Sequence, residues 1–152
     1  MPKYATAERT DRDALVEFLS SRHRAVLITR RASGGLQSSP VTCGIDAQGR
    51  LTVATYPQRA KVSNIRRDPA VSVCVLSDDW NGAYVHLDGT AEVIDLPESV
   101  EPLVEYFRSV AGEHSDWDEY REAMVKQGKS LIRVTIDDWG PVATGGFPPP
   151  TE

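Results

Sequence analysis

The feature that most constrains this chain is a succession of short segments with β-type patterning, separated by tight turns. In residues 71–75, valines alternate with Ser72 and Cys74, which is the period of a half-buried strand. Turns rich in Gly, Asp and Ser at 33–35 and 46–49 leave no room for a helix between neighbouring segments. Six strands are predicted, at residues 25–29, 37–45, 51–55, 71–75, 84–94 and 131–136. Because these strands do not alternate regularly with helices, they predict a mainly β protein, a six-stranded antiparallel barrel.

Helices are expected at the periphery of this barrel. The first covers about residues 11–21, with Thr10 as its N-cap and an apolar stripe along one face. Two helices rich in Asp and Glu follow the long fifth strand. Gly112 is predicted to end the first of them and Ser115 to cap the second.

Three further features predict departures from regular pairing. Pro40 has no amide hydrogen to donate, so its strand should lie at a sheet edge or carry a bulge. Gly89 indicates a bend or a close approach of another backbone. Residues from about 141 to 152 are expected to form an irregular tail of a single domain that covers residues 1–152.

The composition argues against several function classes. A net charge of −5 argues against a duplex nucleic-acid binder, and no run approaches the roughly 18 apolar residues that cross a bilayer. Residues 1–13 are polar and show no secretion signal, so the cytoplasm is the expected location. Cys43 and Cys74 cannot make a four-thiolate zinc site, and the three histidines share no ligand spacing. No metal is therefore expected.

Against this acidic background, residues 57–68 carry a local charge of +3, because four basic residues face a single acid. The third predicted strand ends just before this segment, and Pro57 fits the first turn of a short helix that follows. Unpaired amides and the dipole at a helix start favour phosphate or carboxylate groups, and Arg59 and Lys61 lie in that first turn. This pattern predicts an anion site, although a solvated helix face would show the same residues.

The basic segment also resembles a family signature. Residues 59–69, RAKVSNIRRDP, resemble the signature of the pyridoxamine-phosphate-oxidase-like split-barrel family of flavin and deazaflavin proteins. The resemblance extends to SSPV at 38–41 and GTA at 89–91. Residues 111–121, AGEHSDWDEYR, resemble the helical region of the actinobacterial subgroup that uses coenzyme F420.

This resemblance implies an assembly and a set of site residues. Family members are homodimers of six-stranded split barrels, with two equivalent cofactor sites in clefts at the interface. Residues of the motif would bind the phosphate or acidic tail, and residues of the second and third strands would line the ring. The implied cofactor-binding residues are Ser39, Val41, Thr55, Arg59, Ala60, Lys61, Asn64, Arg67 and Trp80. Trp80 and residues 139–141 would reach the ring from the other protomer.

The leading functional hypothesis is an F420H2-dependent reductase that passes a hydride to a small unsaturated organic substrate. F420 carries a phosphodiester and several glutamates, so it is more negative than FMN. Arg66 and Arg67 could serve that tail, or they could cap the C-terminus of their own helix. The alternatives are an FMN-dependent oxidase or reductase of the same fold, and a non-catalytic protein that binds deazaflavin, flavin or haem. Since a cofactor would supply the redox chemistry, no catalytic residue is assigned.

Overall fold

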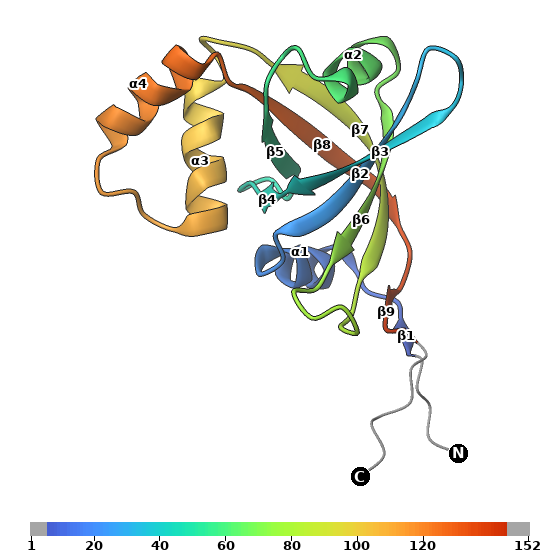
Figure 1. Cartoon of the computed structure of the whole chain (residues 1–152). Coiled ribbons are helices and arrows are strands. Elements are labelled where there is room, and N and C mark those ends of the chain that lie inside the picture. The colour runs from blue at the N-terminus through green and yellow to red at the C-terminus, as the bar shows by residue number, and fades with distance from the viewer. Residues whose placement is uncertain (1–5, 146–152) are drawn as a thin grey trace.

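A strongly curved antiparallel sheet dominates the computed structural model, which describes residues 6–145 (Figure 1). Its order is β3-β2-β6-β7-β8-β5-β4, and all neighbouring strands are antiparallel. The strands are β2 (Arg24–Arg30), β3 (Leu36–Thr42), β4 (Gly44–Ile45), β5 (Leu51–Thr55), β6 (Ala70–Leu76), β7 (Val85–Ile94) and β8 (Ser130–Trp139). The prediction of a mainly β, antiparallel split barrel is confirmed.

Helices lie at the ends and one side of the sheet (Figure 1). They are α1 (Arg12–Ser20), α2 (Ala60–Arg67), α3 (Val100–Ala111) and α4 (Trp117–Gln127). Helices α3 and α4 pack on each other beside the barrel, whereas α2 covers its upper end in the view of Figure 1. Among the described residues, no helix is long and apolar enough to cross a membrane.

The strand count differs from the expected six. The predicted strand 37–45 is divided at Cys43, where the chain leaves one side of the barrel and joins the other. Strand β3 pairs with β2, whereas β4 pairs with β5. The Cys43 amide donates instead to the carbonyl of His23 at 2.9 Å.

Two predicted N-caps are wrong by one residue. Helix α1 is capped by Asp11 instead of Thr10, and α4 by Asp116 instead of Ser115. In both cases the aspartate carboxylate accepts the amide hydrogen bond of the residue three positions on, at 2.9 and 3.1 Å. An aspartate in the next position therefore takes over the role of the hydroxyl residue.

Two other boundaries differ from the expectation. Pro57 lies in a turn before α2, closed by a hydrogen bond from the Arg59 amide to the Tyr56 carbonyl, and Arg59 is the N-cap. The predicted irregular tail contains the short strand β9 (Val142–Ala143), which pairs with β1 (Ala7–Glu8). This contact is long-range in sequence, so local composition could not indicate it. Residues 146–152 of that tail lie outside the described residues.

Both expected strand irregularities are present. Strand β3, which contains Pro40, lies at the edge of the sheet. The register between β7 and β8 shifts between Asp88 and Gly89. A Cβ atom at Gly89 would lie 2.5 Å from the Thr135 carbonyl oxygen, so the close approach of backbone requires glycine.

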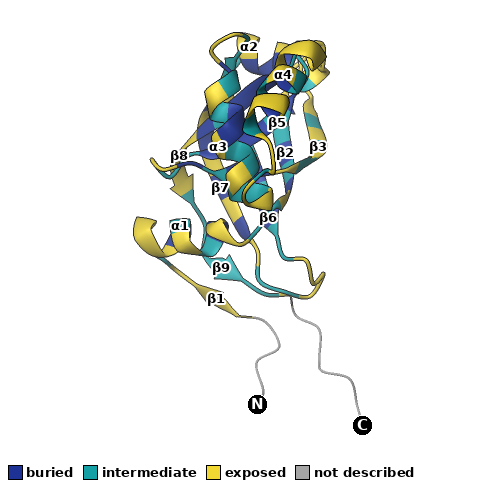
Figure 2. Cartoon of the chain, turned by 90° about the vertical axis from the view of Figure 1, so that its left-hand side faces the viewer, coloured by how far each residue is buried: buried dark blue, intermediate teal, exposed yellow. Residues whose placement is uncertain are grey.

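The core fills the inside of the barrel (Figure 2). Alternate residues of β6 and β7, such as Val73 and Leu87, are fully buried, as period-two patterning predicts. A second small core joins α3 and α4 to β8 through Leu103, Tyr120 and Leu131. The helical pair is thereby held at a fixed place beside the barrel, where it can form one wall of a cleft.

Candidate functional site

A cleft of about 440 Å³ lies between β3 and β5 on one side and α3 and α4 on the other. We call it the β3–α3 cleft. Its walls are mostly apolar or aromatic and come from both sides: Val41, Val53, Ala54, Tyr106, Phe107 and Met124. Two lysines, Lys61 on α2 and Lys129 just after α4, also line it. No Asp or Glu among residues 6–145 lines this cleft, although the whole chain has a net charge of −5.

The start of α2 brings positive charge to this cleft. Arg59 is the N-cap with extended backbone angles and makes no side-chain capping bond, so its guanidinium is not used to close the helix. Lys61 is half-buried. Burial, and after it the nearby Arg59 guanidinium, lowers the pKa of Lys61 below its usual range. An anion beside the two cations would relieve this repulsion.

Two cationic side chains lie close to the Tyr56 ring. The Lys129 ammonium lies 4.0 Å from the ring centroid, and the Arg59 guanidinium carbon lies 5.7 Å from it. Within residues 6–145, no ion pair includes Arg59, Lys61 or Lys129. A cluster of cations without acidic partners, next to apolar and aromatic walls, fits a planar aromatic group that carries an anionic tail. The residues present therefore fit a flavin-type or deazaflavin-type cofactor.

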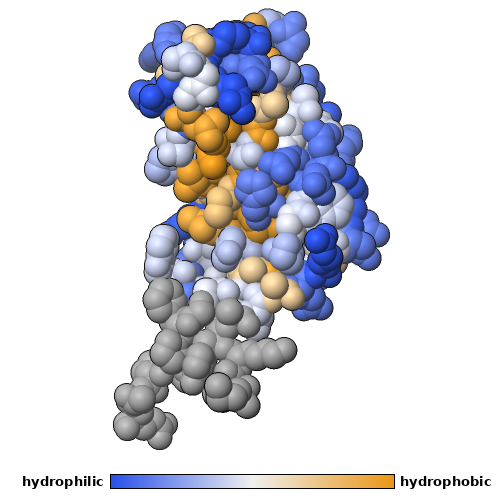
Figure 3. All heavy atoms as spheres, turned by 90° about the vertical axis from the view of Figure 1, so that its right-hand side faces the viewer, coloured by the Kyte–Doolittle hydropathy of each residue, from blue (hydrophilic) through white to orange (hydrophobic). Residues whose placement is uncertain are grey.

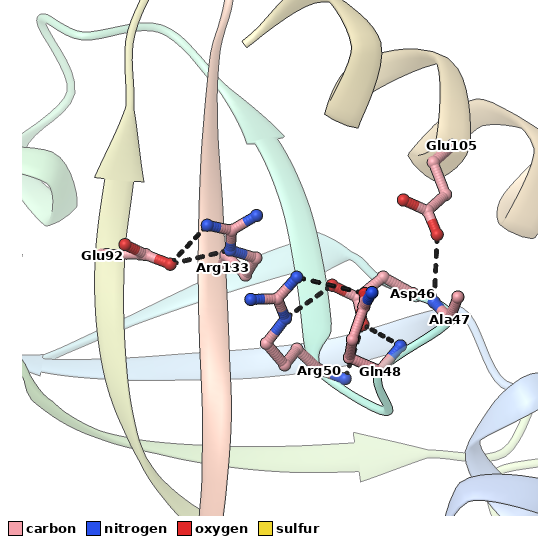
Figure 4. A network of polar contacts seen from close by, with 7 residues as sticks. All are labelled: Asp46, Ala47, Gln48, Arg50, Glu92, Glu105 and Arg133. Atoms are coloured by element: carbon pink, nitrogen blue, oxygen red, sulfur yellow. Dashed lines mark hydrogen bonds and ion pairs between the residues drawn. The ribbon is translucent and has the colours of Figure 1, made fainter. Parts of the chain in front are cut away.

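The position of the α3 wall is fixed by polar contacts to the β4–β5 hairpin. Glu105 accepts a hydrogen bond from the Ala47 amide at 3.0 Å, and Ser109 accepts one from the Ile45 amide at 2.9 Å. Figure 4 shows Glu105 reaching from α3 to the turn that Asp46 and its partners stabilise. This anchoring places Tyr106 and Phe107, on the same helix, against the cleft.

Tyr106 links the two sides of the cleft. Its hydroxyl donates to the carbonyl oxygen of Thr42 on β3 at 3.0 Å. Burial raises the pKa of Tyr106, so the phenol is neutral around pH 7. Ser39 and Val41 share the half-buried face of β3, and Val41 lines the cleft directly. Thr55 is buried at the end of β5, immediately before the turn to α2.

Two of the predicted anion ligands point elsewhere in this protomer. Asn64 is only 6% exposed, and its amide nitrogen donates to Thr29 Oγ1 at 3.1 Å and to Gln37 Oε1 at 2.9 Å. Arg67 donates to Asn64 Oδ1 at 3.0 Å and to the Arg30 carbonyl at 2.9 Å. These bonds fasten α2 to β2 and β3. The Arg67 side chain remains exposed, whereas the side-chain amide of Asn64 already makes hydrogen bonds within the protein.

Arg66 lies in the last turn of α2, as its suggested role at the C-terminus of this helix requires, and it also forms an ion pair. Its guanidinium contacts both carboxylate oxygens of Asp95, at 3.0 and 2.8 Å. Together with the Ser130 hydroxyl, which is the larger cause, this contact lowers the pKa of Asp95. Arg66 therefore ties α2 to the end of β7 and is already paired.

Neither Trp80 nor Trp139 lines the β3–α3 cleft of the same protomer. Trp80 is 82% exposed on the β6–β7 loop, at the opposite end of the barrel from α2 (Figure 1). The Trp139 indole donates to the Thr10 carbonyl at 3.0 Å, and Arg12 lies over its ring. Of these two tryptophans, Trp80 is the one with an exposed ring.

Sequence reasoning missed Lys129, Tyr56 and Tyr106. Lys129 follows a helix-ending glycine at the start of a strand, and it approaches α2 only because β8 pairs with β5. Tyr56 could have been noticed, since it directly precedes Pro57 at the strand–helix junction. Tyr106 belongs to one of the two helices rich in Asp and Glu, which the sequence places at the periphery of the barrel.

A larger hollow of about 550 Å³ lies on the outer face of β2, β6 and β7. None of the nine predicted cofactor residues lines it, and its polar groups include the Asp88 carboxylate, to which Ser72 donates. The β3–α3 cleft is therefore the candidate site. Among the described residues, its lining contains no Asp, Glu, His or Cys, so it offers no carboxylate or imidazole base and no thiol.

Comparisons with known proteins agree with this geometry. The chain resembles a conserved hypothetical protein from Mycobacterium tuberculosis, with 19% identity over 90% of this chain and 89% of that one, and a TM-score of 0.74. It resembles a structure described as an F420 reductase, with 20% identity over 81% and 93%, and a TM-score of 0.61. A haem-binding protein from Mycobacterium smegmatis is similar at 19% identity over 91% and 59%, with a TM-score of 0.65. At such identities these likenesses show the fold alone.

A family match covers most of the chain. The family model described as pyridoxamine 5'-phosphate oxidase matches residues 11–143, which contain the curved sheet, α2 and both walls of the β3–α3 cleft. The chain therefore belongs to the pyridoxamine 5'-phosphate oxidase-like split-barrel family.

Proposed function

We propose that this protein is an F420H2-dependent reductase that transfers a hydride to a small unsaturated organic substrate. The observation that carries the proposal is the β3–α3 cleft, where cations without acidic partners adjoin apolar and aromatic walls. In the part of the chain that the structure describes, no carboxylate, imidazole or thiol side chain lines this cleft, which suits a protein whose bound cofactor supplies the redox chemistry.

The predicted cofactor-binding residues are proposed to contact different parts of the cofactor. Arg59 and Lys61 are proposed to bind the phosphate, Arg59 through its fork of donors and Lys61 as a compact charge. Ala60 lies between them, and its small side chain leaves the helix start open. Ser39, Val41 and Thr55 are proposed to lie against the ring, where the apolar wall excludes water. When bound, the deazaflavin would supply the hydride.

The other two residues of the motif, Asn64 and Arg67, are proposed to have roles other than binding the phosphate. Asn64 is proposed to hold α2 in place through Thr29 and Gln37, and so to orient the cations at the other end of the helix. The exposed Arg67 remains a proposed contact for the acidic tail of F420. A tail with several carboxylates matches a site with more cations than one phosphate requires.

FMN remains a candidate because its phosphate would suit the same cations. A non-catalytic protein that binds a deazaflavin, flavin or haem also remains a candidate, since one of the similar structures is that of a haem-binding protein. Cofactor retention separates the first two candidates, because FMN copurifies from ordinary expression hosts whereas F420 is absent from them. A non-catalytic binder would hold a cofactor tightly but would not oxidise F420H2 with any acceptor.

The outer face of β2, β3 and β6 supports a homodimer. Apolar side chains form a band on this side of the molecule (Figure 3), and Leu36 is 61% exposed there. Val26, Ile28 and Leu76 line adjoining hollows on the same face. A second copy is the proposed occupant, and in that dimer Trp80 and residues 139–141 would approach the partner's cofactor.

Side-by-side binding titrations test the function. F420 and FMN are titrated into wild type, Arg59→Ala and Lys61→Ala, with Arg31→Ala, an exposed turn arginine, as the control for lost charge. We expect tighter binding of F420, a loss of about tenfold in each site variant, and no change in the control. Oxidation of F420H2 is then followed with a panel of unsaturated acceptors. Tight FMN binding, no F420 binding and no effect of either site variant would refute the proposal.

Light scattering tests the assembly. Wild type is expected to have twice the monomer mass, and Leu36→Arg is expected to shift the protein toward monomer because it buries a charge in the apolar interface. A monomeric wild type at tens of micromolar (on the order of ordinary assay concentrations) contradicts the dimer.

A further inference from the structure

Lys129 occupies a rigid position that the family signature does not include. Helix α4 ends at Gly128, which has a φ of +67° and donates to the Val125 carbonyl. The Lys129 amide then donates to the Met124 carbonyl at 3.1 Å, and its own carbonyl accepts from Ser99 Oγ at 2.9 Å. Both backbone polar groups are thus fixed, and the side chain leaves from a defined point.

The sheet register directs Lys129 to the basic segment. Ser130 pairs with Thr55 at the end of the β5–β8 ladder, so Lys129, the residue just before β8, comes beside Tyr56. The Lys129 ammonium lies 4.0 Å from the Tyr56 ring centroid, and Lys129 and Lys61 line the same cleft. Two strands far apart in sequence therefore bring a third cation to Arg59 and Lys61.

The charge of Lys129 has no acidic partner among residues 6–145. Asp95, which accepts a hydrogen bond from the neighbouring Ser130, is already paired with Arg66. Burial, and after it the nearby Arg59 guanidinium, disfavours the charged form of Lys61, and Lys129 lines the same cleft as Lys61. A bound anion would reverse that penalty, and Tyr56 would hold the ammonium at the cleft until the anion arrives.

We propose that Lys129 is an anion-binding residue of the β3–α3 cleft, which completes a three-cation site with Arg59 and Lys61 for the phosphorylated tail of the cofactor. This assignment rests on the proposed function. It also predicts which part of the ligand is recognised: Lys129 contributes to the affinity of a ring that carries a phosphate, but not to that of the same ring without it.

The competing explanation is that Lys129 only packs on Tyr56. Lys129→Met distinguishes the two, because methionine keeps a long side chain that contacts the aromatic ring but removes the charge. Lys129→Arg keeps the charge. Lys126→Met is the matched control, since Lys126 is exposed in the last turn of α4 and does not line the cleft.

Fluorescence or calorimetric titrations provide the readout, with F420 and FMN each measured beside its counterpart that lacks the phosphate. For the phosphorylated ligand that wild type binds, we expect Lys129→Met to weaken binding about tenfold, whereas Lys129→Arg and Lys126→Met stay near wild type. Ligands without phosphate should bind all four proteins alike. Equal weakening of both ligand types, or none in Lys129→Met, overturns the assignment while wild-type binding still supports the proposed function. If wild type binds neither cofactor, the proposed function fails and this assignment fails with it.

Discussion

Replacement of Asn64 by alanine tests whether this residue acts on the site through the fold. The substitution removes three hydrogen bonds, two donated to Thr29 and Gln37 and one accepted from Arg67. Each neutral bond contributes about 1 kcal/mol, and the Arg67 bond contributes less than a buried charged bond because that side chain is exposed. Thr29, which is 2% exposed, would lose its partner inside the barrel. The expected loss in the free energy of unfolding is about 2–3 kcal/mol.

Urea unfolding at one fixed protein concentration measures this loss. Ser63→Ala, an exposed neighbour on α2, is the control and should change the free energy of unfolding by less than about 0.5 kcal/mol. The midpoint of Asn64→Ala should fall without a change in the denaturant slope. A stability equal to wild type, together with weakened cofactor binding, would refute this reasoning and make Asn64 a direct ligand.

Three further outcomes are expected. Gly89→Ala should unfold at clearly lower urea, because its Cβ would meet the Thr135 carbonyl oxygen at 2.5 Å, whereas Gly140→Ala, with its nearest atom at 4.0 Å, should resemble wild type. Affinity for an anionic cofactor should fall as the pH rises through the lowered pKa of Lys61, where the ammonium loses its proton, and Lys61→Arg should remove that dependence if Lys61 binds the anion. Cys43, which is 1% exposed and whose pKa burial raises to about 12, should react with a thiol reagent only after unfolding; rapid labelling of Cys43 in the native protein would contradict its burial.

Most of the fold follows from local patterns. The alternation at 71–75 gives β6, and the turn at 46–49 gives the β4–β5 hairpin. The errors occur where a long-range contact decides: β9 exists because β1 lies beside it, and the split at Cys43 reflects the change of pairing partner. Local composition contains neither contact.

The candidate site was less predictable than the fold. The position of Arg59 and Lys61 at a strand–helix junction follows from sequence, because the helix start and the basic residues are adjacent. The internal bonds of Asn64 and the ion pair of Arg66 do not, because their partners lie on β2, β3 and the end of β7. One motif thus contains residues that face the cleft and residues that fasten the helix carrying them.

The distribution of acids gives the strongest electrostatic argument for an anionic ligand. The chain has 22 acidic and 17 basic residues, so an average surface would be negative. Nevertheless, no acidic residue in the described range 6–145 lines the β3–α3 cleft, although α3 and α4 carry several. In α3, Glu105 turns to the Ala47 amide and Glu101 pairs with Arg121, while Tyr106 and Phe107 face the cleft. An acidic wall would repel a phosphorylated cofactor, whereas this one presents rings to a planar group and leaves the lysines to attract its tail.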